Sequence, residues 1–209
     1  MCTVIVRTGQ PLTMLAVRDE LTDRPWEGPG QHWPDYPGLL GGRDLKAGGT
    51  WLAVDSAARR VAAVLNGHGT PAPEAVKISR GDLPLRAAAT GVMPEVDLPR
   101  YDPFHLLIAD LTGARLFSWD GVRLARHDLE EGAITKIVNV GVVPADPVFA
   151  TSTDWMEQAR AEPRDDPEAL IVHHELPDGR IFASLSATAI TLDETGMSYD
   201  FAALDRLQP

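Results

Sequence analysis

The only cysteine of the chain is its second residue. If Met1 is removed, which a small side chain at position 2 generally permits, Cys2 carries a thiol and a free α-amine on one carbon. Because such an amine titrates near pH 7.7–8 (roughly), it accepts the thiol proton at cellular pH and serves as an internal base. The competing interpretation is that Cys2 is a small hydrophobic residue buried in a first strand.

A charged cluster lies one predicted hairpin away from Cys2. Residues 2–7 and 12–18 are apolar or β-branched and flank a Gly-Gln-Pro turn signal, so they predict an N-terminal hairpin. In this hairpin Arg18 and Asp19 lie across from the first residues. A guanidinium beside the thiol would lower its pKa, and a carboxylate would orient an α-ammonium. The competing interpretation is a solvated, charged strand end.

Composition limits the classes of protein that remain. The chain has 209 residues, enough for one sizeable core, and we expect a single domain over 1–209. The formal net charge of -11 argues against nucleic acid and anionic lipid as partners. No apolar run is long enough to span a bilayer and no secretory signal is present, so we expect a cytoplasmic protein without stable membrane insertion. Oligomeric state is left open.

The remaining pattern predicts many strands and few helices. Further strands are expected at 49–55, 60–66, 104–110, 114–119, 122–127, 134–140, 180–193 and 196–201. Helices are expected at 83–90 and 154–162, with a helical continuation over 167–173. Residues 22–49, rich in Pro, Gly and Trp, are expected to form a long ordered loop or covering flap. This order predicts an α+β fold with two layers of sheet.

Several segments resemble the successive motifs of the NRDE family, the family of transport and Golgi organisation protein 2. They are MCTVIV (1–6), LAVRDE (15–20) followed by Arg24-Pro25, LLGGRDLKAGGTWLAVD (39–55), VAAVLN (61–66), SRGDLP (79–84) and FASLSATAI (182–190). The long glycine-containing segment is the most specific of these motifs.

This family resembles the N-terminal-nucleophile hydrolases, especially penicillin V acylase and bile salt hydrolase. The resemblance implies a four-layer αββα sandwich of two antiparallel sheets. It also implies that an N-terminal cysteine attacks an amide, with an arginine and an aspartate after the second strand and two asparagines that hold the oxyanion and substrate. By motif these residues are Cys2, Arg18, Asp19, Asn66 and Asn139.

Two departures from the family pattern argue against amide hydrolysis. The motif that names the family begins with asparagine, where this chain has Val17. Many members carry an arginine in the C-terminal strand motif, where this chain has Leu185. Any polar role of these two side chains is therefore lost.

Four more residues are candidates for ligand binding. Trp26 and Trp51 would line an apolar pocket near the flap, although tryptophan usually packs in a core or lid. Arg43 stands in a glycine-rich stretch that would approach a ligand closely, although glycines also punctuate ordinary tight loops. His68 follows Asn66 by two residues and would reach the same site.

Three functions remain open from the sequence. The first is a hydrolase of a small amide or acyl substrate, which requires no cofactor or metal. The second, implied by the family resemblance, is a carrier or chaperone for a hydrophobic ligand such as haem or an acyl lipid, with Cys2 or His68 as axial haem ligands. The third is a retained scaffold with an inactive site.

Overall fold

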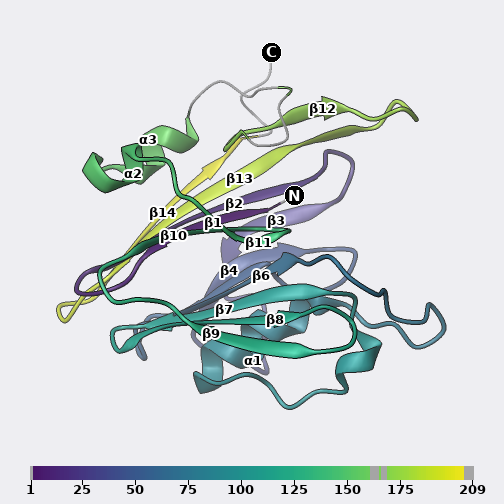
Figure 1. Ribbon diagram of the computed structural model, residues 1–209, viewed down its shortest axis with the longest axis horizontal. Coiled ribbons are helices and arrows are strands. Elements are labelled where there is room, and N and C mark those ends of the chain that lie inside the picture. Colours follow the sequence, from purple (N-terminus) through teal and green to yellow (C-terminus); the bar gives the residue numbers. More distant parts are fainter. Residues whose placement is uncertain (1, 161–164, 166–168, 205–209) are drawn as a thin grey trace.

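Two antiparallel β-sheets make up most of the protein, whose computed structural model describes residues 2–160, 165 and 169–204 (Figure 1). Short helices accompany the sheets. The predicted combination of two antiparallel sheets with few helices is therefore confirmed.

The first sheet contains the N-terminal hairpin. Its strands are β1 (Thr3–Arg7), β2 (Leu12–Leu21), β10 (Ile134–Val138), β11 (Gly141–Val143), β12 (His173–Glu175), β13 (Ile181–Leu192) and β14 (Met197–Ala203). They pair in the order β11-β10-β1-β2-β13-β12, and β14 also pairs with β13. The predicted hairpin is confirmed, with Thr3 opposite Val17.

The second sheet is a meander in which each strand pairs with the next one along the chain. Its strands are β3 (Trp26–Gly30), β4 (Leu39–Asp44), β5 (Leu52–Asp55), β6 (Arg60–Asn66), β7 (Phe104–Asp110), β8 (Gly113–Trp119) and β9 (Leu124–Asp128). The hairpin of β5 and β6 agrees with its prediction.

The expectation of a long ordered loop or covering flap over 22–49 is wrong over 26–30 and 39–44, which form β3 and β4. Apolar alternation is missing because glycines are required where neighbours approach closely. A Cβ on Gly41 would stand 2.3 Å from the Leu52 carbonyl oxygen, and one on Gly42 would stand 2.3 Å from the Trp51 ring. Glycine therefore hides the strand pattern that would otherwise identify β4.

The helices are short. They are α1 (Leu83–Thr90), α2 (Val148–Thr151) and α3 (Trp155–Ala159), with 3₁₀ turns at η1 (Arg80–Asp82) and η2 (Leu98–Arg100). Helix α1 ends at Gly91 as predicted, with a left-handed φ of 77°. The helical continuation over 167–173 lies partly outside the described residues, and it is wrong at His173, which is in β12. No helix in the described part of the chain is long and apolar enough to cross a membrane.

Buried side chains form three clusters. One lies between the two sheets and combines residues such as Val6 and Met14 with Leu52 and Leu107. A second joins α1 to the opposite face of the second sheet, and a third joins α2 and α3 to the opposite face of the first sheet. Because strand side chains alternate between faces, the direction of each residue near Cys2 follows from these clusters. Cys2 packs against the inner cluster.

Candidate functional site

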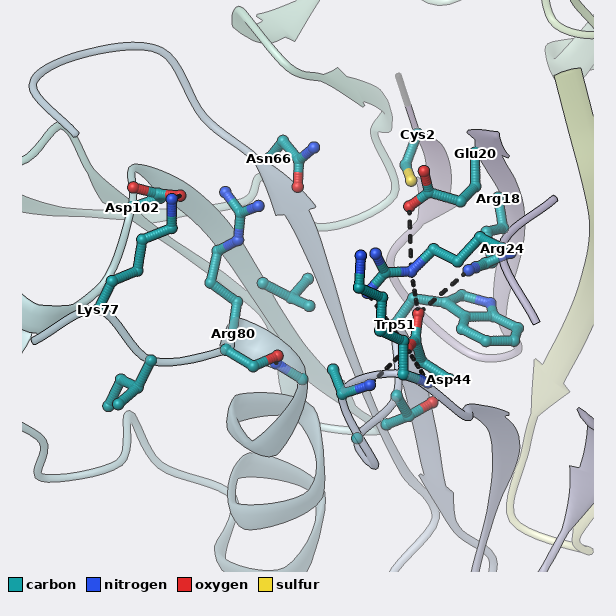
Figure 2. A pocket seen from close by; sticks show the side chains of 18 of the residues that line it. Cys2, Arg18, Glu20, Arg24, Asp44, Trp51, Asn66, Lys77, Arg80 and Asp102 are labelled. Carbon is teal, nitrogen blue, oxygen red and sulfur yellow. Dashed lines mark hydrogen bonds and ion pairs between the residues drawn. The ribbon is translucent and has the colours of Figure 1, made fainter. Parts of the chain in front are cut away.

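A cavity of about 460 Å³ opens beside Cys2 (Figure 2). Its lining comes from the N-terminus, the end of β2, the β4–β5 connection, the end of β6 and the segment before α1. Five of the residues singled out from the sequence line it: Cys2, Arg18, Asp19, Trp51 and Asn66. The fold thus brings together side chains from both sheets. Among these five residues the largest separation in the sequence is 64 positions, from Cys2 to Asn66.

Strand register places Cys2 beside Arg18. Thr3 pairs with Val17 in the β1–β2 hairpin, so the next pair toward the open end of the hairpin is Cys2 with Arg18. Their neighbours Val4 and Ala16 both belong to the inner cluster, so Cys2 and Arg18 lie on the inner face of the sheet. The thiol approaches the Asp19 carbonyl oxygen at 3.9 Å.

Asn139 reaches the same residue from the other neighbour of β1. It follows β10, which pairs with β1, and its Oδ1 accepts a hydrogen bond of 3.3 Å from the main-chain nitrogen of Cys2. Asn139 is not among the described residues that line the cavity. It therefore contacts the backbone of Cys2 and leaves the thiol facing the open space.

Arg18 is buried, with only 4% of its surface exposed. Three side chains contact its guanidinium. Its Nη2 donates to Asp44 Oδ2 at 3.3 Å, and its guanidinium carbon lies 4.5 Å from the centre of the Trp51 ring and 6.0 Å from that of Trp26. The buried Nη1 has no hydrogen-bond partner in the described part of the chain. A buried cation with one unused donor is a ready site for an anionic or strongly polar ligand group.

Asp44 is a central residue of the site that the sequence did not single out. It accepts hydrogen bonds from Arg24 at 2.5 and 3.1 Å and from the backbone nitrogens of Lys46 and Ala47. Burial alone would raise the pKa of this carboxyl, but the Arg24 hydrogen bonds and the other donors lower it overall. Its position in the glycine-rich motif, next to Arg43, is the signal in the sequence that points to it.

The pKa of the Cys2 thiol is raised, which corrects the expectation that Arg18 would lower it. Burial is the largest cause, and the charge of Asp19 adds to it. Arg18 acts in the expected direction, but its effect is smaller. The thiol is therefore protonated at neutral pH, and a nucleophilic role requires a base that removes its proton.

Asp19 is buried near the end of β2, where a bulge in β13 places it opposite Ser184, and it also lines the cavity. The Ser184 hydroxyl donates to Asp19 Oδ1 at 2.6 Å. Burial raises the pKa of Asp19 to about 7, although this hydrogen bond opposes the shift. Asp19 therefore titrates in the physiological range. Ser184 had no distinguishing signal in the sequence.

We expect Asp19→Asn to stabilise the protein at pH 8. Asp19 has a folded pKa of about 7, whereas an unfolded aspartate titrates near ~3.9. Between these values the folded state retains a proton that the unfolded state releases, so stability falls as pH rises through this window. Urea unfolding should show a gain on the order of 2–4 kcal/mol at pH 8 and almost none near pH 4. The exposed Asp23→Asn is the control, and an equal gain at both pH values would contradict the prediction.

His105 supports the site from the second sheet. Its Nε2 donates to the Asn139 carbonyl oxygen at 3.2 Å, which makes Nδ1 the acceptor of the Ser118 hydroxyl at 2.8 Å. Burial lowers the pKa of His105, consistent with a neutral ring. This network joins β7 to the turn that carries Asn139. The only signal in the sequence was a histidine within an otherwise apolar strand.

His105→Phe should destabilise the protein by about 1–3 kcal/mol, because it leaves the Ser118 hydroxyl and the Asn139 carbonyl without their partner. The measurement is the midpoint of urea unfolding. The exposed His127→Phe, on β9, serves as the matched control. Equal midpoints for the two variants would show that the network contributes nothing.

Three predicted ligand-binding residues do not line the described cavity. Trp26 contacts Arg18 and the Trp51 ring from outside it. Arg43 has a buried Nε with no partner among the described residues, and His68 is exposed. Their predicted role in ligand binding stays a prediction.

The two departures from the family pattern also lie away from the cavity. Val17 is 2% exposed and packs in the cluster with α2 and α3, on the face opposite Cys2. Leu185 is fully buried at the bulge of β13 and is not among the described lining residues. A polar side chain at position 17 would point away from the thiol, so Val17 removes nothing from the cavity itself.

The fold and the site define a protein of two antiparallel sheets that places its single cysteine beside a buried arginine in a polar cavity. Residues 1–139, about two thirds of the chain, match the family Transport and Golgi organisation 2. The chain belongs to this family, which confirms the resemblance seen in its motifs. No curated protein is significantly similar to it in sequence. The matched range includes all described residues of the cavity.

Proposed function

We propose that this protein is an N-terminal-cysteine hydrolase of a small amide or acyl substrate, with Cys2 as the nucleophile after removal of Met1. The observation that carries the proposal is the placement of Cys2: its main-chain nitrogen contacts Asn139 while its thiol lines the cavity. After processing, that nitrogen is the α-amine. Base and nucleophile would then belong to one anchored residue.

The raised thiol pKa makes this base necessary. In the first step the α-amine takes the thiol proton and Sγ attacks the carbonyl carbon. The tetrahedral intermediate collapses, the C–N bond breaks, and the ammonium returns its proton to the leaving nitrogen. In the second step the amine takes a proton from water, which attacks the thioester and releases a carboxylic acid and the free thiol.

We assign the binding of the developing oxyanion to Asn66. It ends β6 and lines the cavity that also contains the thiol (Figure 2). Its amide N–H would donate to the oxyanion, a type of interaction that contributes on the order of 10²–10³ in rate. Arg18 would hold the substrate beside Sγ, and the buried Asp19 would orient the α-amine.

The helices on the outer faces of both sheets support the finer fold assignment within this proposal. Cluster contacts join α1 to one sheet and α2 with α3 to the other. This layering is compatible with the αββα order of N-terminal-nucleophile hydrolases, in which helices cover two facing sheets. We further propose that the protein is cytoplasmic and that its partner is a small molecule.

The mass of the intact protein purified from cells tests the first requirement. We expect the loss of Met1, because Cys2 has a small side chain. A protein that retains Met1 in every preparation would contradict the α-amine mechanism. Sequencing of the first residues by fragmentation would identify the new terminus as Cys2.

A carrier for a hydrophobic ligand such as haem is the alternative. Half of the described residues that line the cavity are Asp, Glu, Lys or Arg, whose side chains an apolar macrocycle would desolvate. The exposed His68 does not line it, whereas Cys2, the other axial candidate, does. The charged lining favours the hydrolase over a carrier of haem. Titration with haem or long-chain acyl-CoA, followed by tryptophan fluorescence, should show no saturable change.

A further inference from the structure

Arg80 enters the cavity from the segment before α1 and stands in the SRGDLP motif (79–84), but the proposed mechanism does not use it. Its Nη1 donates to the Pro103 carbonyl oxygen at 2.8 Å. Within the described part of the chain no carboxylate lies within 4.0 Å of its guanidinium. Figure 2 shows the side chain extending into the cavity toward the side on which Asn66 lies.

Four of the five described carboxylates that line the cavity pair with other cations, among them Glu20 with Arg24 at 3.6 Å, and Asp19 accepts from Ser184. Asp44 is paired with Arg24, and Asp102 accepts from Lys77 at 3.1 Å. Lys77 also contacts Glu74 at 3.1 Å. Arg80 therefore has no ion-pair partner among the described side chains, although Asp102 and Glu20 favour its charged form at longer range.

On the other side of the cavity, Arg18 also has an unused hydrogen-bond donor. This donor is its buried Nη1, which has no partner among the described residues. Both guanidiniums lie close enough to Cys2 to be stabilised by a negative charge on its sulfur. Burial lowers the pKa of Arg80, yet arginine stays protonated in proteins. Two partly desolvated cations with unused donors therefore converge on the space in front of the thiol.

We infer that this cavity selects compounds that carry a carboxylate, and that Arg80 together with the free Nη1 of Arg18 binds it. The inference rests on the proposed function, because it specifies the substrate class as an acyl compound with an anionic group. Planar guanidinium groups match a carboxylate through paired N–H donors, and such charge-assisted bonds are stronger than neutral ones. A neutral amide would leave Arg80 without an ion-pair partner and the Nη1 of Arg18 without an acceptor.

Alkylation of Cys2 tests this inference without requiring hydrolysis. The thiolate displaces iodide from iodoacetate, which is anionic, or from iodoacetamide, which is neutral, and forms the same C–S bond. Because Cys2 is the only cysteine, the rate reports this cavity alone. We expect the iodoacetate-to-iodoacetamide rate ratio to be at least about tenfold higher in the folded protein than in urea.

Arg80→Gln should reduce that ratio by about three- to tenfold, whereas Arg100→Gln, an exposed residue outside the cavity, should leave it unchanged. Arg80→Lys keeps the positive charge and should therefore retain most of the preference for iodoacetate. A native ratio no higher than that in urea, or no alkylation by either reagent, would overturn the inference. These outcomes are separate from the acyl-enzyme experiment below, because alkylation needs neither the α-amine nor an amide substrate.

Discussion

A chain that begins at Cys2 will form a thioester with a reactive acyl ester, and the Cys2→Ala variant will form none. The thiol is the only cysteine side chain and it lines the cavity. A chain with one uncleaved residue before Cys2 should acylate about 10²–10⁴-fold more slowly, because the main-chain nitrogen is then an amide and cannot act as a base. Intact-mass kinetics measures both rates.

Hydroxylamine identifies the product. It cleaves a thioester but leaves an amide intact, so it distinguishes acylated Sγ from an acyl group on the α-amine. Chains with and without the extra residue must unfold at the same temperature for the comparison to hold. Equal acylation rates in the two chains would refute the role of the α-amine, while the inference about Arg80 would remain open to its own test.

Asp44→Ala should destabilise the protein by about 3–5 kcal/mol, the range for removing one partner of a buried ion pair. Asp44 is 8% exposed and contacts two guanidiniums, Arg18 and Arg24, as well as two backbone N–H groups. Without it these donors lose their acceptor. Guanidinium unfolding measures the change, and the exposed Asp35→Ala should change stability by less than about 0.5 kcal/mol.

The pH dependence of this effect has a definite sign. The folded-state pKa of Asp44 is lowered, so its contribution is present above the unfolded pKa and is lost as pH falls through the folded pKa. The difference in free energy of unfolding between Asp44→Ala and the parent protein should therefore be constant above about pH 5 and shrink below about pH 4. A difference that grows in acid would contradict the proposed charge state.

Much of the site could be predicted from the sequence, because the register of a hairpin is set by its own turn and by the alternation of its two strands. Alternation in residues 2–18 and the turn between them were enough to place Arg18 across from Cys2, and both line the cavity. The same reasoning failed for β4, where glycines required by close packing replace the apolar pattern. It also misjudged the thiol pKa, because burial outweighs the charge of a single neighbour.

The amino-acid sequence by itself determined the hairpin, the family and the position of the single cysteine. Only the tertiary structure decided how distant groups meet it: Asn139 contacts the Cys2 nitrogen, Asp44 pairs with Arg18, and Arg80 lines the same cavity. These contacts depend on how two sheets pack and on which side chains lose water when they do. Neither packing nor desolvation has a local pattern along the chain, and both change the charge and reactivity of the residues they bring together.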